Sequence, residues 1–483
     1  MDPAPQAAVS FGNPALGGRA RTNRLGTAEH SPHRVVGARR ARCTRRALQA
    51  TVLSAVAGTA AFTAACGAAT EPAAALRPRA RDVKDELVWL TWSSNTGVRG
   101  TAYGNMTKQF NERFPNVTVT QVPPPAGPFG ATFEKLVTTI AAGERLDLVG
   151  VVPEYVPVYM DRAKALTDLN AWIRRDPAYK ATDHVKGAID GLTWKGRLGA
   201  LPVGLSTSIA IYNAELLQRK GIAPPKPDWD VNQLVDLAKR LTEPKGDDTI
   251  WGYHDRMPNP LRLYTYVWAF GGEPMTPREE PTQFRWSKDA KTLQAIEWVI
   301  DLHRKHGVRA GGHTSEGDSG SGAFPKNRVA ISGWQINTFD SVPPDIRYDV
   351  IPMPRGPNGR HLYFWGFCYG LSPQSKNPDL AWDLLKHVSG EPGQREWMTH
   401  ARFAPSLKTL LGGPYQKLDG PPASKQLVVD AALATERFPM HVRWPDMLPK
   451  IEQMIRDADA GTKSVRDALI TLDAELEVVS RSS

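Results

Sequence analysis

The chain has 483 residues and a formal net charge of +10, and its length suits about two globular domains. Nine arginines and two acidic residues precede Cys66, so this leader carries +7 of the net charge. Because the basic charge is concentrated in the leader, it gives no ground for a nucleic-acid-binding protein, and we expect no nucleic-acid partner.

Residues 1–65 have the layout of an export signal. The stretch "TRRALQATVLSAVAGTAAFTAAC" (44–66) runs from basic residues through a modest apolar region to small residues. Its start resembles a twin-arginine signal. A membrane span needs about 20 strongly apolar residues, and this region is rich in Ala and Thr, so we expect a cleaved signal.

Cys66 follows "TAA" and resembles the lipidated cysteine of bacterial lipoproteins. The resemblance implies attachment of lipid to the Cys66 sulfur and an anchor on the outer face of the cell membrane. The alternative is an ordinary cleavage site with an incidental cysteine. Residues 66–86 are Ala, Pro and charge without an apolar period, which predicts a tether. Since only Cys368 would remain as a free thiol, we expect no internal disulfide.

Apolar runs and helical spacings alternate after the tether and predict an α/β fold with a parallel sheet. Ligands of such sheets bind beyond the carboxyl ends of the strands, here at 92–97 and 153–157. The expected elements are strand 86–92, helix 101–113, strand 117–122, helix 133–143 and strand 146–152.

Helix boundaries are marked clearly further along the chain. Asp230 is expected to cap one helix, and Asn377, followed by Pro378, another. The segment 446–478 predicts two helices around "AGTKS".

Several phrases in order resemble one family, the extracellular solute-binding proteins of bacterial ABC importers, in their sugar-binding lipoprotein branch. The long leader and "FPKNRVAISG" depart from that pattern. The matching phrases are "LPVGLSTSIAIYNAELLQRKGI" (201–222), "DWDVNQLVDLAKRLT" (228–242), "WAFGG" (268–272), "AFPKNRVAISGW" (323–334), "FCYGLSPQSKNPDLAWDLLKHVSG" (367–390), "FAPSLKT" (403–409) and "AGTKSVRDALITLDAEL" (460–476).

The resemblance implies a two-lobed, periplasmic-binding-protein-like α/β fold with discontinuous lobes joined by crossing strands and hinged around a ligand cleft. Crossings would fall near 200–205, 367–371 and 403–406. The implied division is lobe 1 at 87–203 with about 368–402, and lobe 2 at 204–367 with about 403–479.

A sugar site needs aromatic plates for the ring face and short polar groups for the hydroxyls. We expect Trp298 and Trp382 to lie in the core, Tyr212 to pack behind the cleft, and Asp147 to be either a structural cap or a contact. The expected ligand-binding residues are Trp92, Asn95, Glu154, Ser206, Thr207, Trp268, Trp334 and Trp365.

The expected function is capture of a sugar or oligosaccharide by a monomeric, membrane-anchored protein that hands it to the transmembrane subunits of an ABC permease. The alternatives are a secreted carbohydrate-active enzyme and a surface binding module without a permease. No carboxylate pair stands out for glycoside hydrolysis. His303 and His306 lack further ligands at a recognised spacing, so we expect neither metal nor cofactor.

Overall fold

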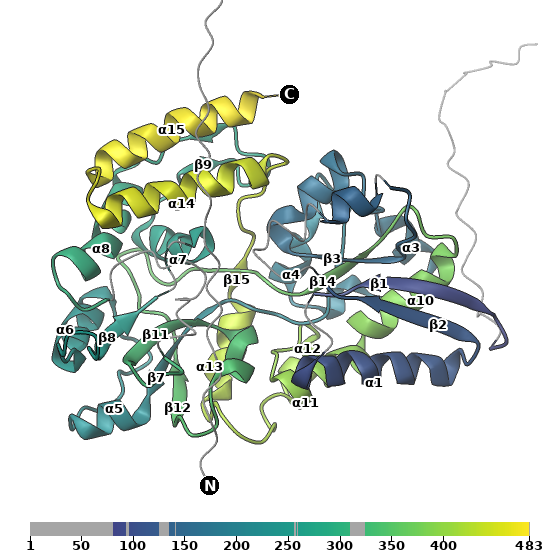
Figure 1. Cartoon of the computed structure of the whole chain (residues 1–483), viewed down its shortest axis with the longest axis horizontal. Helices are drawn as coiled ribbons and strands as arrows, with labels where there is room; N and C mark the ends of the chain where they lie inside the picture. Colours follow the sequence, from purple (N-terminus) through teal and green to yellow (C-terminus); the bar gives the residue numbers. More distant parts are fainter. Residues whose placement is uncertain are drawn as a thin grey trace, which may run out of the picture. The chain divides into compact units, whose positions relative to one another are not determined.

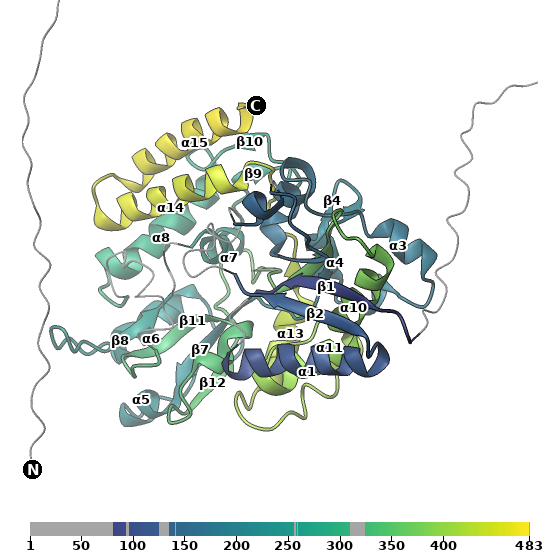
Figure 2. The same ribbon diagram turned by 45° about the vertical axis from the view of Figure 1, so that its right-hand side comes forward.

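The fold is known from a computed structural model, which describes residues 81–92, 96–124, 135–140, 142–255, 257, 259–309 and 324–482. These residues all fall within Thr70–Ser483, the larger of the chain's two units (Figures 1 and 2). The predicted signal, Cys66 and Asn95 lie outside the described residues.

A five-stranded sheet in the order β2-β1-β3-β14-β6 forms the first half of the described unit. β1 runs parallel to β2 and β3, as the sequence predicts, but β14 is antiparallel to both β3 and β6, so the sheet is mixed. Its strands are β1 (Asp85–Leu90), β2 (Val117–Val122), β3 (Leu148–Val151), β6 (Leu201–Pro202) and β14 (Cys368–Leu371).

Helices with apolar faces cover this sheet. In α1, Met106 and Phe110 are buried four residues apart, and the helix packs on α10 and α11. The Asn377 side chain accepts a hydrogen bond from the Leu380 amide at 3.2 Å, so the predicted cap is confirmed. These helices are α1 (Gly97–Arg113), α3 (Asn170–Arg175), α4 (Lys186–Gly191), α10 (Pro378–Ser389) and α11 (Glu391–Ala401).

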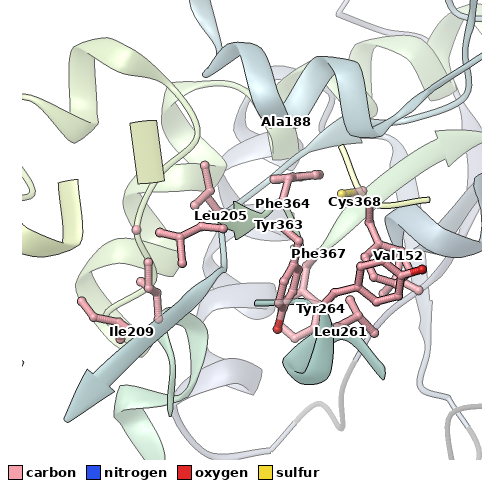
Figure 3. Packing of buried hydrophobic residues seen from close by; sticks show 14 of the residues in the cluster. Val152, Ala188, Leu205, Ile209, Leu261, Tyr264, Tyr363, Phe364, Phe367 and Cys368 are labelled. Carbon is pink, nitrogen blue, oxygen red and sulfur yellow. The ribbon is translucent and has the colours of Figure 1, made fainter. Parts of the chain in front are cut away.

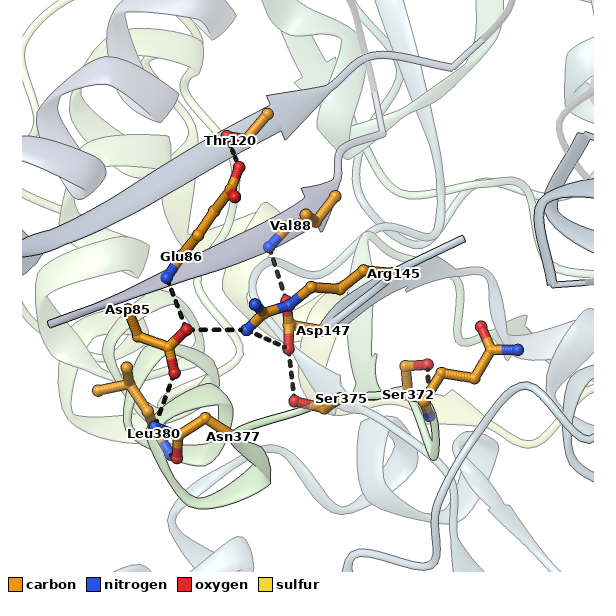
Figure 4. A network of polar contacts seen from close by, with 11 residues as sticks. Asp85, Glu86, Val88, Thr120, Arg145, Asp147, Ser372, Ser375, Asn377 and Leu380 are labelled. Atoms are coloured by element: carbon orange, nitrogen blue, oxygen red, sulfur yellow. Dashed lines mark hydrogen bonds and ion pairs between the residues drawn. The ribbon is translucent and has the colours of Figure 1, made fainter. Parts of the chain in front are cut away.

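A polar network links the amino-terminal ends of the strands β1 and β3 (Figure 4). Asp147 is fully buried and accepts hydrogen bonds from the Val88 amide at 2.8 Å and from Arg145 Nε at 2.9 Å. Arg145 also reaches Asp85, which accepts a hydrogen bond from Asn377. Of the two roles open for Asp147, the structure shows the structural one.

A four-stranded sheet in the order β12-β7-β11-β8 forms the second half. β11 is antiparallel to β7 and parallel to β8, so β8 and β11 end at the same edge. Both strands are almost wholly buried, as expected for a sheet with covered faces. The strands are β7 (Ser208–Asn213), β8 (Trp251–His254), β11 (Val329–Gln335) and β12 (Tyr348–Ile351).

The helices of the second half follow local sequence signals closely. Asp230 and Gln233 form a capping box at the start of α6, as expected for Asp230. The two helices predicted within 446–478 are present as α14 and α15, which pack on each other and on α8. The helices are α5 (Ala214–Arg219), α6 (Val231–Leu241), α7 (Pro260–Phe270), α8 (Ala290–Arg304), α12 (Lys408–Leu411), α13 (Lys425–Leu433), α14 (Trp444–Ala460) and α15 (Val465–Arg481).

Short elements complete the described chain. β13 pairs with β15, and β4 and β9 form small hairpins with β5 and β10. They are η1 (Pro153–Tyr155), η2 (Val158–Arg162), η3 (Ala181–Asp183), β4 (Thr193–Trp194), β5 (Arg197–Leu198), β9 (Met275–Thr276), β10 (Gln283–Phe284), η5 (Ile336–Ser341), β13 (Leu362–Tyr363) and β15 (Thr435–Glu436).

Candidate functional site

Three chain segments lie side by side between the two sheets. The Ser206 amide donates to the Trp365 carbonyl at 2.7 Å, and the Trp365 amide donates back at 2.9 Å. The Leu205 amide donates to the Ala404 carbonyl at 2.7 Å. Around them, apolar side chains such as Leu205 and Phe367 pack closely (Figure 3). These paired segments fit the crossing strands of the two-lobed fold, and we call the halves lobe 1 and lobe 2 after their sheets.

Trp92 and Glu154 both lie at the carboxyl end of the lobe 1 strands. Trp92 follows β1, its indole N–H donates to the Cys368 carbonyl at 2.9 Å, and its ring stacks on Phe367 with centroids 5.9 Å apart. Glu154 follows β3, in η1. The expectation that the strand ends would bring these positions to one edge is therefore met.

Within the described part of the chain, Glu154 has one carboxylate oxygen with a hydrogen-bond partner and one without. Its side chain is buried, at 6% exposure. The Trp365 indole N–H donates to Oε1 at 3.3 Å, whereas Oε2 has no hydrogen-bond partner among the described residues. Burial raises the pKa of Glu154 from 4.5 to about 7, although hydrogen bonds from its own backbone N–H and from Trp365 oppose this rise. The carboxyl group can accept a further hydrogen bond on Oε2.

Trp365 supplies an aromatic surface beside that carboxyl group. It belongs to the second of the three segments, is only partly buried, and meets Phe367 edge-on with centroids 5.6 Å apart. An indole ring next to a carboxylate offers the two surfaces that a sugar ring needs. Two of the predicted site residues therefore contact Trp365: Glu154 through its side chain and Ser206 through backbone hydrogen bonds.

An ion pair joins the two lobes close by. Arg99, in the first turn of α1, contacts Asp340 of η5 at 2.9 Å and 3.2 Å, and its guanidinium lies 5.4 Å from the centre of the Phe403 ring. Next to it, the Ser206 hydroxyl donates to Asn337 Oδ1 at 2.6 Å. The sequence did not predict Arg99, Asn337 or Asp340 as site residues. Arg99 lies just beyond the predicted rim segment 92–97, whereas Asn337 and Asp340 follow β11, where no rim segment was predicted.

The remaining predicted residues lie within lobe 2 or its border. The Thr207 hydroxyl donates to the Tyr363 carbonyl at 2.7 Å. Trp334 lies on β11 at 2% exposure, and Arg262 donates to its carbonyl at 2.6 Å. Trp268 lies on α7 in a buried aromatic cluster, with the Arg278 guanidinium 4.3 Å from its ring centre. The structure does not place these three beside Glu154, and their ligand contacts stay predictions.

Residues expected to be structural lie as follows. Trp382 is fully buried, so its expected place in the core is confirmed. Trp298 is only partly buried and packs against the core from outside. Tyr212 is partly buried and borders a surface hollow with Leu217 and Pro224. His303 contacts Asp459 at 3.2 Å.

The described part of the chain shows neither a metal-binding cluster nor a membrane-spanning helix. Within it, no group of three or more His, Cys, Asp and Glu side chains could hold a metal ion. No helix in the same ranges is long and apolar enough to cross a membrane.

One family model and several known proteins are similar to this chain in sequence. A family model described as bacterial extracellular solute-binding protein matches residues 105–419. A probable ABC transporter-binding protein of Deinococcus radiodurans is 24% identical over 244 residues, which cover 48% of this chain and 57% of that protein. The arabinooligosaccharide-binding protein of Bacillus subtilis is 21% identical over 333 residues, covering 65% of this chain and 72% of the relative.

Solved structures show the fold. An ABC substrate-binding protein from Listeria monocytogenes in complex with cycloalternan matches with a TM-score of 0.72 at 19% identity, covering 82% of this chain and 99% of that one. A maltose-bound protein of T. maritima matches with a TM-score of 0.69, also at 19% identity, covering 82% of this chain and 100% of the other. The two-lobed α/β fold expected from the sequence is thus confirmed.

Proposed function

Because the chain belongs to the bacterial extracellular solute-binding proteins, we propose that it captures a sugar or oligosaccharide and delivers it to the permease subunits of an ABC importer. The observation that carries the proposal is the contact between Glu154 and Trp365 at the junction of the lobes. A carboxylate oxygen without a partner beside a partly exposed indole suits a sugar hydroxyl and a sugar ring face. Two similar proteins of Bacillus subtilis, an arabinooligosaccharide-binding and a galactooligosaccharide-binding protein, support the same ligand class.

We propose that capture closes the lobes by bending within the three paired segments. Their backbone hydrogen bonds, such as Val203 to Phe367 at 3.0 Å, keep the connection narrow and ordered. The proposed lobe boundaries are those expected from the sequence, near 203, 367 and 403. A permease that recognises the closed form can then distinguish loaded from empty protein.

The location follows from the family, and the mode of attachment from the leader. The family is extracellular, so the protein is exported. We propose in addition that lipid on Cys66 anchors it to the outer face of the membrane and that residues 66–86 form a tether. The apolar stretch before Cys66 and its small neighbours support this proposal.

A ligand screen followed by calorimetry tests the proposed function. A sugar present at 100 times its Kd stabilises the folded protein by about 2.7 kcal/mol, which a thermal-shift screen detects. Replacing Trp365 by alanine should then weaken binding at least tenfold while the melting temperature changes little, since the ring is partly exposed. The control, Trp382→Ala, removes a fully buried ring and should lower the melting temperature sharply.

Three results would contradict the proposal. No stabilisation by any sugar in a broad panel would remove the ligand class. Cleavage products after incubation with glycans would favour a carbohydrate-active enzyme. Undiminished sugar uptake by cells that lack the protein would favour a binding module without a permease.

A further inference from the structure

Glu154 has a charge environment that constrains the ligand further. Its carboxyl group is buried, one oxygen has no hydrogen-bond partner among the described residues, and no described residue forms an ion pair with it. A buried carboxylate without a cation has no local compensation for its charge. Any ligand group that enters beside Oε2 meets that charge directly.

The ionisable groups around Glu154 do not offset its charge. Tyr155, on the same short helix, and Tyr159, one turn on, both interact electrostatically with it, as does Cys368 on β14. Burial raises the pKa of each of the three, so each stays neutral at physiological pH. Trp365 contributes a neutral N–H donor.

Three of the cations that link the lobes have anionic partners. Arg99 forms a two-pronged pair with Asp340 at 2.9 Å and 3.2 Å. Lys195, in the turn between β4 and β5, contacts Glu280 at 2.6 Å. Arg162 of η2 contacts Asp446 of α14 at 3.0 Å, and Arg443 shares that carboxylate at 2.9 Å. A negatively charged ligand would thus find these cations engaged.

From this arrangement we propose that Glu154 filters ligands by charge: the site accepts a sugar whose unit beside Glu154 is uncharged and donates a hydroxyl, and it excludes acidic sugars such as uronates and sugar phosphates. The proposal rests on the proposed sugar-binding function and names the class of sugar. An uncharged hydroxyl gives Oε2 the donor that it lacks. A carboxylate in the same place adds a second buried negative charge and brings no donor.

The size of the discrimination follows from Coulomb's law. Two like charges about 6 Å apart at an effective dielectric constant of about 20 repel strongly enough to weaken binding about 100-fold. An acidic unit far from Glu154 would be affected less, since the repulsion falls with distance. The filter therefore acts on the unit that contacts Trp365.

Matched neutral and acidic sugars test the proposal. The probes are oligosaccharides of equal length built from galactose or galacturonate, mannose or mannuronate, and glucose or glucuronate, with each pair differing only in the group at C6. Each is measured by thermal shift and then by calorimetric titration at pH 8, where Glu154 is mainly ionised. The variants are Glu154→Gln and the control Glu144→Gln, which replaces an exposed glutamate of the same lobe.

The expected result is that at least one neutral sugar binds and that its acidic counterpart binds about 100-fold more weakly. In Glu154→Gln the gap should narrow by at least tenfold, whereas Glu144→Gln should retain it. Equal or tighter binding of the acidic partner to the natural protein overturns the charge filter and leaves sugar binding standing. An unchanged gap in a folded Glu154→Gln protein also overturns it. If no sugar binds, the proposed function fails and the charge filter fails with it.

Discussion

Replacing Glu154 by glutamine should remove a loss of stability that the ligand-free protein suffers as the pH rises. The pKa of Glu154 is about 7 in the folded protein against 4.5 for an ordinary glutamate, because burial disfavours its ionised form. The folded state therefore holds this proton more tightly than the unfolded state, and the natural protein loses stability as the pH rises from 4.5 to 7. Each pKa unit corresponds to about 1.4 kcal/mol, so the loss is about 1 kcal/mol at pH 5 and about 3 kcal/mol at pH 8.

Glutamine cannot ionise, so the Glu154→Gln protein does not lose stability in this way as the pH rises. Its buried amide also has fewer partners than it needs, which lowers stability by a similar amount at every pH. That constant contribution cancels when the stability of Glu154→Gln relative to the natural protein is compared between pH 5 and pH 8. We therefore expect the free energy of unfolding of Glu154→Gln, relative to the natural protein, to be about 2 kcal/mol more favourable at pH 8 than at pH 5.

Urea unfolding followed by tryptophan fluorescence at the two pH values measures this difference. Glu144→Gln is the control, because an exposed carboxyl group lacks the burial that would make its replacement pH-dependent. The reasoning is refuted if Glu154→Gln shows the same relative stability at pH 5 and pH 8. If Glu154 destabilises the folded protein and yet improves sugar binding, its role is functional rather than structural.

Three further changes have distinct expected outcomes. Trp334→Ala should lower both the melting temperature and the sugar affinity, the latter about 30-fold, and normal affinity measured by titration would remove Trp334 from the site. Arg99→Gln should weaken sugar binding about fivefold, because it loosens the link between α1 and η5. In a double-mutant cycle, Asp340→Asn should add little to that loss of affinity, and full additivity of the two losses would argue that the two residues do not act together. Cys66→Ala should move the protein out of the membrane fraction, and an unchanged distribution on fractionation would contradict lipid anchoring.

Local signals in the sequence predicted many elements well. The alternation of "VTVTQV" predicted the strand 117–122 with the bounds that β2 has. Asp230 and Asn377 predicted two helix starts because an N-cap side chain bonds backbone amides only two or three residues further on. Helix α1 begins at Gly97, before the predicted 101, since the opening turn holds polar and small residues rather than an apolar stripe.

Long-range pairing could not be predicted in the same way. β14 joins the lobe 1 sheet more than 200 residues after β3, and its antiparallel direction depends on how the chain returns from lobe 2. The sequence predicted Glu154 in a rim segment and Trp365 just before a crossing, but it could not show that they touch or that one carboxylate oxygen lacks a partner among the described residues. The Arg99–Asp340 pair was missed because its partners lie on different lobes.

A crystal structure of the protein with the tightest-binding oligosaccharide tests the central claim most directly. We predict a sugar ring lying against the Trp365 indole, with a hydroxyl donating to Glu154 Oε2 at about 2.5–3.0 Å. The lobes should be closed around it, with the Arg99–Asp340 pair intact. A ligand bound elsewhere, with Glu154 Oε2 still lacking a donor, would contradict the account.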